Sequence, residues 1–198
     1  MRKGEVTVAE VKRIQTPLTK DVAAGLRAGD RVLISGTIYT GRDAAHKRLA
    51  ALLEEGKELP LDIRNQIIYY VGPAPAPPGR AIGSVGPTSS YRMDRYAPLL
   101  IEKGLTGMIG KGLRGPAVIE AMKAHHAVYF AATGGAAVVI AKSIISQEII
   151  AYEDLGTEAI HRLEVKDFPV IVAIDSLGNN LYETGREEYQ GKGNHSNI

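Results

Sequence analysis

Three short loops in the sequence combine glycine with a cationic residue, and each follows a stretch with the composition of a β-strand. Glycine lets the backbone approach a ligand closely, and arginine grips a carboxylate through two parallel hydrogen bonds. Loops at strand ends gather at one edge of an α/β sheet. Two arginines and a lysine placed there could hold the two carboxylates of a small diacid. The loops are Gly41-Arg42-Asp43, the segment from Gly86-Pro87-Thr88 to Arg92, and Gly110-Lys111-Gly112.

The same cations have a purely structural alternative. Arg42 could cap a carbonyl group or pair with Asp43. Arg92 could pair with Asp94, and Lys111 could be solvated. Surface ion pairs of this kind contribute only about 0–1 kcal/mol to stability. Residue types and spacing therefore leave both interpretations open.

Other kinds of chemistry have little support. The lysine loop at residues 110–112 lacks the spacing and the following Ser or Thr of a P-loop, and the fingerprints of serine hydrolases, zinc proteases and dinucleotide-binding folds are absent. A Ser–His–Asp triad is defined by geometry and has no fixed order in a sequence. The adjacent His125 and His126 would point to opposite faces of an extended segment, so we expect structural roles for them and no metal site.

Composition narrows the class of protein further. The 198 residues, 44% of them hydrophobic, suffice for one core, so we expect a single domain over residues 1–185 and a polar, frayed tail over residues 186–198. The 24 Lys and Arg nearly balance the 22 Asp and Glu, which argues against nucleic-acid or membrane binding. The sequence contains no cysteine, so this chain alone cannot supply an iron–sulfur or zinc–thiolate site. With no hydrophobic leader at its start, the sequence favours a cytoplasmic protein.

The elements that must position the three loops alternate between strands and helices. This order favours an α/β fold in which a mixed sheet is flanked by helices. Residues 72–79 are rich in proline and glycine and predict an extended connection. The predicted strands are residues 6–11, 31–39, 67–71, 81–85, 106–109, 127–133 and 170–175. The predicted helices are residues 21–28, 43–54, 93–103 with Pro98 inside it, 116–124 and 136–144.

Several motifs, in this order, resemble the β subunit, or C-terminal domain, of class I fumarate hydratases and L-tartrate dehydratases. The resemblance covers about residues 26–182, and the ordered set is specific although each piece is weak. The motifs are Ser35-Gly-Thr-Ile-Tyr-Thr-Gly-Arg-Asp-Ala-Ala-His46, Gly83-Ser-Val-Gly-Pro-Thr-Ser-Ser-Tyr-Arg-Met-Asp94, Ile109-Gly-Lys-Gly112, Thr133-Gly-Gly-Ala-Ala137 and Asp175-Ser-Leu-Gly-Asn-Asn-Leu-Tyr182.

The resemblance implies one part of a hydro-lyase. In such an enzyme a separate α subunit binds a [4Fe–4S] cluster through cysteines, which is consistent with the lack of cysteine here. The β part would be a swivelling β/β/α domain, inactive without its α partner, and the αβ unit would dimerise further. The substrate would be a small dicarboxylic acid, with fumarate and malate expected first. L-tartrate dehydration and a non-catalytic dicarboxylate-binding module are the alternatives.

The resemblance also implies roles for individual residues. Arg42, Arg92 and Lys111 would contact the substrate carboxylates, and Thr88 would transfer a proton beside one of them, with Lys111 assisting in catalysis. A threonine hydroxyl is a poor base, so Thr88 would need an activating neighbour. The motif carries Ser89 where the family often has a second threonine, and the bulky Tyr91 leaves the choice of acid open.

The residues next to Arg42 have expected supporting roles. Gly41, Asp43 and His46 would orient Arg42 or line the site. As structural alternatives, Asp43 could cap the helix that follows it and His46 could lie on the polar face of that helix.

Overall fold

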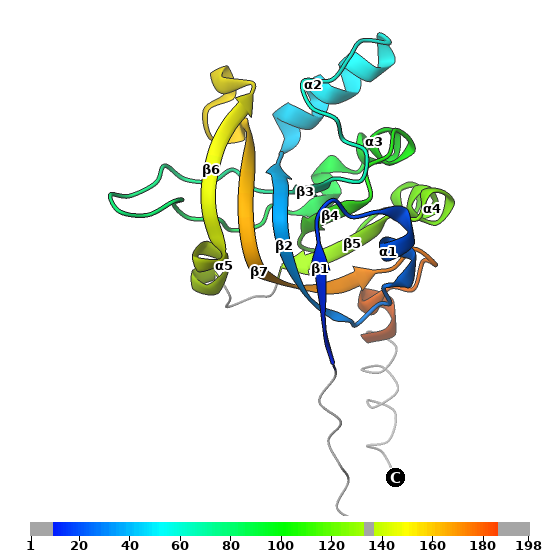
Figure 1. Ribbon diagram of the computed structural model, residues 1–198. Coiled ribbons are helices and arrows are strands. Elements are labelled where there is room, and N and C mark those ends of the chain that lie inside the picture. The colour runs from blue at the N-terminus through cyan, green and yellow to red at the C-terminus, as the bar shows by residue number, and fades with distance from the viewer. Residues whose placement is uncertain (1–9, 133–136, 186–198) are drawn as a thin grey trace, which may run out of the picture.

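A seven-stranded mixed sheet forms the body of the protein. The computed structural model describes residues 10–132 and 137–185 (Figure 1). The strands lie in the order β1-β2-β3-β4-β5-β7-β6. Their bounds are β1 Val11–Gln15, β2 Arg31–Thr40, β3 Ile67–Tyr69, β4 Gly107–Gly110, β5 Val128–Ala132, β6 Ile144–Ala151 and β7 Ile160–Ile174.

The sheet closes on itself through β7. Strands β1 to β5 are parallel, whereas β7 runs antiparallel to β2, β5 and β6. The 15 residues of β7 are long enough to pair with β2 over most of their length and with β5 near the C-terminal end. The pairings β2–β3, β3–β4, β4–β5, β5–β7 and β7–β2 therefore complete a ring, and β1 and β6 extend it at either side.

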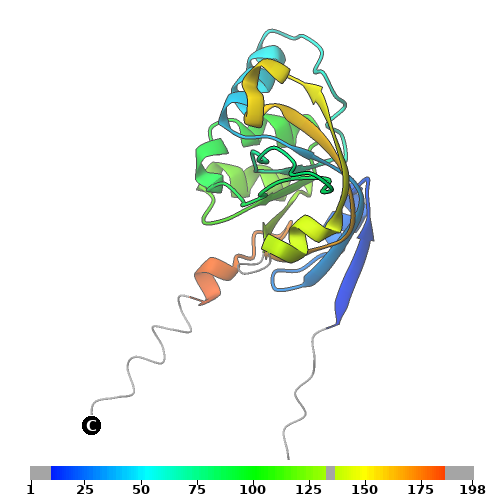
Figure 2. The same ribbon diagram turned by 90° about the vertical axis from the view of Figure 1, so that its left-hand side faces the viewer.

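Helices cover the outer face of β3, β4 and β5, and α3 and α4 lie side by side there (Figure 2). The strand side chains alternate between two cores, as the pleat of a strand requires. Ile67 and Tyr69 of β3 face the interior of the ring, whereas Ile68 and Tyr70 face the helices. The helices are α1 Lys20–Gly25, α2 Asp43–Glu54, α3 Ala97–Glu102, α4 Pro116–His125 and α5 Ala137–Ser143, with 3₁₀ turns η1 Ser90–Met93 and η2 Glu153–Glu158.

Most predicted elements are present, and the mixed sheet with flanking helices is confirmed. The helix over residues 43–54 has the predicted bounds. The helix predicted over residues 93–103 is wrong in extent, because Pro98 cannot continue a helix and instead sits in the first turn of α3, after the separate turn η1. Strand β6 and residues 160–169 of β7 were not predicted. Much of the first predicted strand and the whole tail over residues 186–198 lie outside the described residues.

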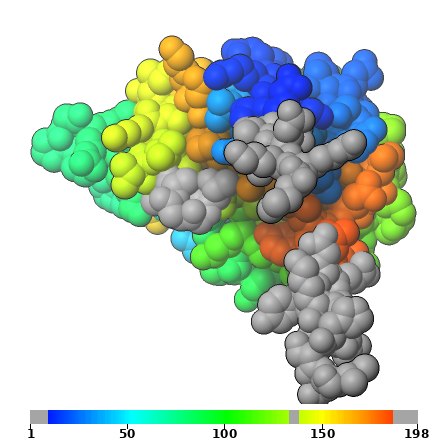
Figure 3. Space-filling view, turned by 90° about the horizontal axis from the view of Figure 1, so that it is seen from below, coloured from blue at the N-terminus to red at the C-terminus, as the bar shows by residue number. Residues whose placement is uncertain are grey.

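The strand predicted over residues 81–85 is also wrong. This segment folds back on the proline-rich connection, where Ala74 N donates to Ser84 O at 3.0 Å. A Cβ atom on Gly83 would overlap the carbonyl oxygens of Ala74 and Pro75, so the close approach requires glycine. The resulting arm protrudes from the body beyond β6 (Figures 1 and 3). Among the described helices, none is long and apolar enough to cross a membrane.

The core inside the ring predicts a clear stability difference. Phe168 on β7 is fully buried and packs edge-on against the ring of Tyr69, with 5.4 Å between centroids. Phe168→Ala should lower the free energy of unfolding by about 3–5 kcal/mol in urea titrations. Ile145→Ala is the control, since that side chain is 61% exposed on β6 and should change stability by less than about 0.5 kcal/mol. Equal effects of the two substitutions would contradict the closed core.

Candidate functional site

The parallel register of β2, β3 and β4 brings two of the predicted cations to one edge of the sheet. Thr40, Tyr69 and Ile109 lie level with one another. Beyond them, Gly41 N donates to Tyr69 O at 3.0 Å and Tyr70 N donates to Ile109 O at 2.8 Å. Arg42 lies two residues after Thr40, and Lys111 lies two residues after Ile109. Because they leave strands two apart, their backbones are separated by roughly 10 Å.

The loop that carries Thr88 fills the space between these two strand ends. Thr88 N donates to Tyr70 O at 2.6 Å, and Ser90 N donates to Lys111 O at 2.9 Å. Parallel ladders use every second residue, so Lys111 O is the acceptor that a continued β3 would have used. The chain turns away after β3 and returns to this position. Thr88 therefore lies between the loops of Arg42 and Lys111.

Asp43 joins the two arginines. Arg92 Nε donates to Asp43 Oδ1 at 2.8 Å, and Asp43 Oδ2 lies 3.9 Å from Arg42 Nε. Glu158, at the end of η2, approaches the other side of Arg42 with 3.8 Å between Oε1 and Nε. Two arginines and two carboxylates thus meet here, and Lys111 adds a further positive charge on the nearby loop after β4.

The guanidinium of Arg42 is only partly satisfied by these contacts. Its Nε is buried without a hydrogen-bond partner among the described residues, as are Asp43 Oδ2 and Glu158 Oε1. The side chain lies against Gly72, where an added Cβ would come within 3.1 Å of Arg42 Cδ and Nη1. A buried unpaired donor is costly, so this nitrogen is suited to receive an anionic oxygen from a ligand.

His46 holds the backbone of Arg42 through a hydrogen bond to its carbonyl oxygen. Its Nδ1 lies 2.9 Å from Arg42 O, and because a carbonyl only accepts, Nδ1 carries the proton and donates. The ring is fully buried, packs edge-on against Tyr70, and leaves Nε2 without a partner among the described residues. An added Cβ on Gly41 would lie 3.3 Å from Ile68 Cγ2 and 3.4 Å from His46 Cε1, so the backbone here packs closely against both side chains.

The side chains of Thr88 and Lys111 have no polar partner in the described part of the chain. Neither forms a hydrogen bond or an ion pair there, and Lys111 is exposed. Lys111 is thus available for a ligand. The activating neighbour that Thr88 would need is not supplied by any described residue.

Several structural alternatives are wrong. Arg92 pairs with Asp43, and Asp94 pairs instead with Arg114. Asp43 does not cap α2: Arg42 occupies the cap position and no side-chain cap bond forms there. His46 faces the core and not the polar side of the helix.

His125 and His126 do not lie in an extended segment. His125 ends α4, and His126 follows in a left-handed conformation that closes the helix. A structural role at the helix end therefore fits both. Among the residues that the structure describes, no group of three or more His, Cys, Asp or Glu side chains could hold a metal ion.

Gly72 and Glu158 also contact Arg42, and neither was predicted from the sequence as a site residue. Gly72 has a signal, since it directly follows a buried strand at the start of the proline-rich connection. Glu158 has no such signal in the local sequence, because it comes close to Arg42 only through the pairing of β6 with β7. Both residues define the surroundings of Arg42 as much as the predicted ones do.

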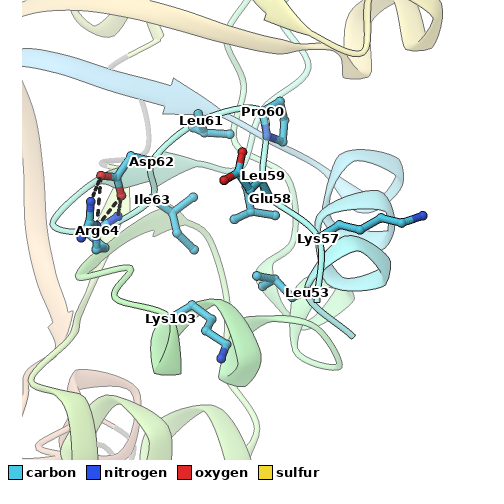
Figure 4. A pocket seen from close by; sticks show the side chains of 10 residues that line it. All are labelled: Leu53, Lys57, Glu58, Leu59, Pro60, Leu61, Asp62, Ile63, Arg64 and Lys103. Carbon is cyan, nitrogen blue, oxygen red and sulfur yellow. Dashed lines mark hydrogen bonds and ion pairs between the residues drawn. The ribbon is translucent and has the colours of Figure 1, made fainter. Parts of the chain in front are cut away.

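A second cation-bearing hollow lies at the far end of α2 (Figure 4). It has a volume of about 550 Å³ and an apolar floor that includes Leu53 and Ile63. Its arginine, Arg64, pairs with Asp62 at 2.5 Å. Because α2 runs for 12 residues, this hollow is separated from Arg42 by roughly 18 Å of helix. The hollow is therefore distinct from the strand-end cluster.

The fold and the cluster together define an α/β domain with a ring-closed mixed sheet and an edge at which cationic side chains gather. Comparison with known proteins agrees with this class. The family described as "Fumarase C-terminus" matches residues 2–185, and the chain belongs to that family.

Individual relatives carry related names. The chain is 43% identical over 155 residues to "Fumarate hydratase class I, anaerobic" of Escherichia coli K12, which covers 77% of this chain and 28% of that protein. It is 37% identical over 182 residues to "Fumarate hydratase class I, aerobic" of Salmonella typhimurium, covering 91% of this chain and 31% of the relative. It is 36% identical over 172 residues to "Putative L(+)-tartrate dehydratase subunit beta" of Methanocaldococcus jannaschii, covering 84% of this chain and 88% of the relative. The chain thus spans less than a third of the fumarate hydratases that it matches.

Burial of His46 predicts a pH dependence of stability. Burial lowers the pKa of His46 from 6.5 to about 4, so the unfolded chain takes up the proton first as the pH falls. The resulting stabilisation is complete above about pH 6.5 and is lost as the pH falls toward 4, by an amount on the order of 3 kcal/mol.

His46→Gln tests this dependence because glutamine keeps a donor but does not titrate. Urea unfolding at pH 7, 5.5 and 4.5 should show a smaller loss of stability for the variant than for the wild type. Parallel losses in the two proteins would show that His46 is not the group responsible.

Proposed function

We propose that this chain is the β-type part of an iron–sulfur hydro-lyase, most directly a class I fumarate hydratase that interconverts fumarate and water with malate. The observation that carries the proposal is the meeting of Arg42, Asp43 and Arg92 beside the loops of Thr88 and Lys111. Family membership and the named relatives support it. We treat residues 1–185 as one domain of this type, in agreement with the matched range.

The reaction requires a second component. Iron–sulfur clusters are held by cysteine thiolates, and this chain has no cysteine. Its described residues also contain no other group that could hold a metal ion. We therefore assign the [4Fe–4S] cluster to an α-type partner, in keeping with the printed name "subunit beta" of one relative and with the small share of the fumarate hydratases that this chain spans. When bound there, the cluster would supply a Lewis acid for the departing hydroxyl.

Within this proposal the residues of this chain bind and orient the diacid. Arg42 would offer its guanidinium, whose Nε makes no hydrogen bond to a described residue, and Lys111 would offer an exposed ammonium at the same edge of the sheet. Arg92, fixed by Asp43, completes the set of cations. These charges would also stabilise the negative charge that builds on a carboxylate as the adjacent carbon loses its proton. Thr88 would relay that proton once a partner carboxylate activates its hydroxyl.

The proposal extends to the arrangement of the enzyme. The β-type domain would swivel against the cluster-bearing part and close over substrate, the αβ unit would dimerise, and the complex would work in the cytoplasm. Exposed apolar side chains on α5 and β6 support the presence of an assembly, since surfaces of this kind are typical of interfaces. They are Val138, Val139, Ile145 and Ile149.

L-tartrate dehydration is the second candidate. The relative named as a putative tartrate dehydratase β subunit matches this chain over 88% of its own length, so the two have similar extents. Both acids present two carboxylates to the same cations, and the bulky, exposed Tyr91 lies next to Arg92. Comparing kcat/KM for malate and tartrate in the assembled enzyme decides between the candidates.

The assembled enzyme should lose activity when a clamp residue is removed. Arg92→Ala should lower kcat/KM for malate by about 10²-fold or more, as expected for the loss of a charged donor that acts in the transition state. Arg95→Ala is the matched control: this exposed arginine lies three residues away and stacks over Tyr96 at 5.1 Å, away from Asp43. It should leave the rate unchanged. An unchanged rate in Arg92→Ala would remove Arg92 from the site.

The shared nature of the site predicts that this chain alone is colourless and inactive. Mixing it anaerobically with a cysteine-bearing α-type chain should restore the reaction. Calorimetry on the isolated chain should show only weak diacid binding, because each missing charged partner removes about 1.5–3 kcal/mol. Tight binding without a copurifying partner would instead indicate a non-catalytic dicarboxylate-binding module.

A further inference from the structure

A buried arginine that the proposed chemistry does not use lies beneath the site. The side chain of Arg114 is 0% exposed, and its guanidinium packs over the rings of Tyr70 and Tyr129 at 5.2 and 5.0 Å. Its Nε donates to Asp94 Oδ1 at 2.7 Å. Taking a charge out of water is costly, and such a pair is weak evidence for stability alone. The location of its contacts suggests what the pair does.

Asp94 links two segments that each carry a proposed clamp residue. Besides Arg114, it accepts a hydrogen bond from Gly115 N at 2.5 Å. Asp94 immediately follows η1, two residues after Arg92. Arg114 and Gly115 follow Lys111 by three and four residues. The carboxylate therefore fastens the turn of Arg92 to the loop of Lys111.

Tyr129 on β5 makes a second link between the same segments. Its hydroxyl donates to Gly112 O at 2.9 Å and lies 2.8 Å from Ser90 Oγ. Since the tyrosine proton is used on the carbonyl, Ser90 donates to Tyr129. Ser90 N also donates to Lys111 O, and Ser90 Oγ occupies the space that a Cβ on Gly110 would need. Tyr129 thus sits directly between the start of η1 and the peptide that follows Lys111.

We propose that Tyr129 and Arg114 are positioning residues that fix the separation of Arg92 and Lys111, so that both cations engage one diacid. This inference rests on the proposed function. Lysine is a flexible point charge, so the reach of its ammonium depends on a firmly placed backbone. Small misplacements of binding groups have large effects on rate because they disturb the reactive geometry. Tyr129 sets the position of the Lys111 loop, and Arg114 sets that of Asp94 and η1.

Tyr129→Phe tests the role of Tyr129 because it removes the hydroxyl and keeps the ring beneath Arg114. In the enzyme assembled with its cluster-bearing partner, kcat/KM for malate should fall by roughly three- to tenfold, as for the loss of a hydrogen bond. The same substitution made in a Lys111→Ala background should have almost no further effect. A residue that merely stabilises the fold would lower the rate by the same factor in both backgrounds.

Tyr69→Phe is the matched control. Tyr69 is also buried, with a pKa that burial raises, and its hydroxyl donates to the backbone oxygen of Val85. It faces the core inside the ring and makes no bond to the Lys111 loop. Any effect of Tyr69→Phe on kcat/KM should therefore be the same with and without Lys111.

The outcomes distinguish a failure of the proposed function from a failure of the positioning role of Tyr129. If Lys111→Ala alone leaves turnover unchanged, Lys111 is not in the site, and both the proposed function and the inference are overturned. If Lys111→Ala impairs turnover but Tyr129→Phe acts equally in both backgrounds, only the inference is overturned. Should Tyr129→Phe fail to fold, Ser90→Ala removes the other partner of the hydroxyl. It should show the same coupling to Lys111, and its absence would overturn the inference.

Discussion

The parallel register of β2, β3 and β4 is the constraint on which the site depends. It sets Thr40, Tyr69 and Ile109 level, so that Arg42 and Lys111 emerge at one edge. The strand spacing then fixes the distance between their backbones before any side chain is placed. Because β3 is short and leaves the sheet early, the edge has a gap, and the Thr88 loop fills it: Thr88 N donates to Tyr70 O, and Ser90 N donates to Lys111 O, the acceptor that a continued strand would have used. Strand pairing and the returning Thr88 loop thus bring three distant segments together at this edge.

Closure of the ring by β7 gives this edge its electrostatic character. The pairing of β7 with β2 and β6 carries Glu158 toward Arg42, and Asp43 bridges the two arginines. The carboxylates lie beside the arginines, yet Arg42 Nε forms ion pairs at 3.8–3.9 Å without a hydrogen bond, and Lys111 makes no ion pair with a described carboxylate. The site is therefore organised without being neutralised. This is the condition that an anionic substrate requires.

Local patterns made part of this arrangement predictable. The helix over residues 43–54 has clear helical spacing, and the loops of Arg42 and Lys111 follow predicted strands that the structure contains, β2 and β4. The loop of Thr88 was also expected at a strand end, but the strand predicted before it is absent. The ion-pair partners inside the cluster were harder to predict from the sequence. Arg92 has an acidic neighbour two residues away in Asp94, but the fold supplies Asp43 as its partner instead, since Asp94 is taken by Arg114. Competition between distant partners leaves no trace in local sequence. Strand β6 went unpredicted although it pairs with the next strand along the chain, because it is an edge strand with little buried surface and no regular alternation of buried and exposed residues.

A structure of the assembled, cluster-bearing complex with a non-reactive dicarboxylate such as succinate tests the central claim most directly. The account predicts that the carboxylate groups lie within hydrogen-bond distance of Arg42, Arg92 and Lys111, with the connecting carbon atoms beside Thr88. A diacid bound elsewhere, for instance in the hollow lined by Arg64 and Lys103 at the far end of α2, would contradict it.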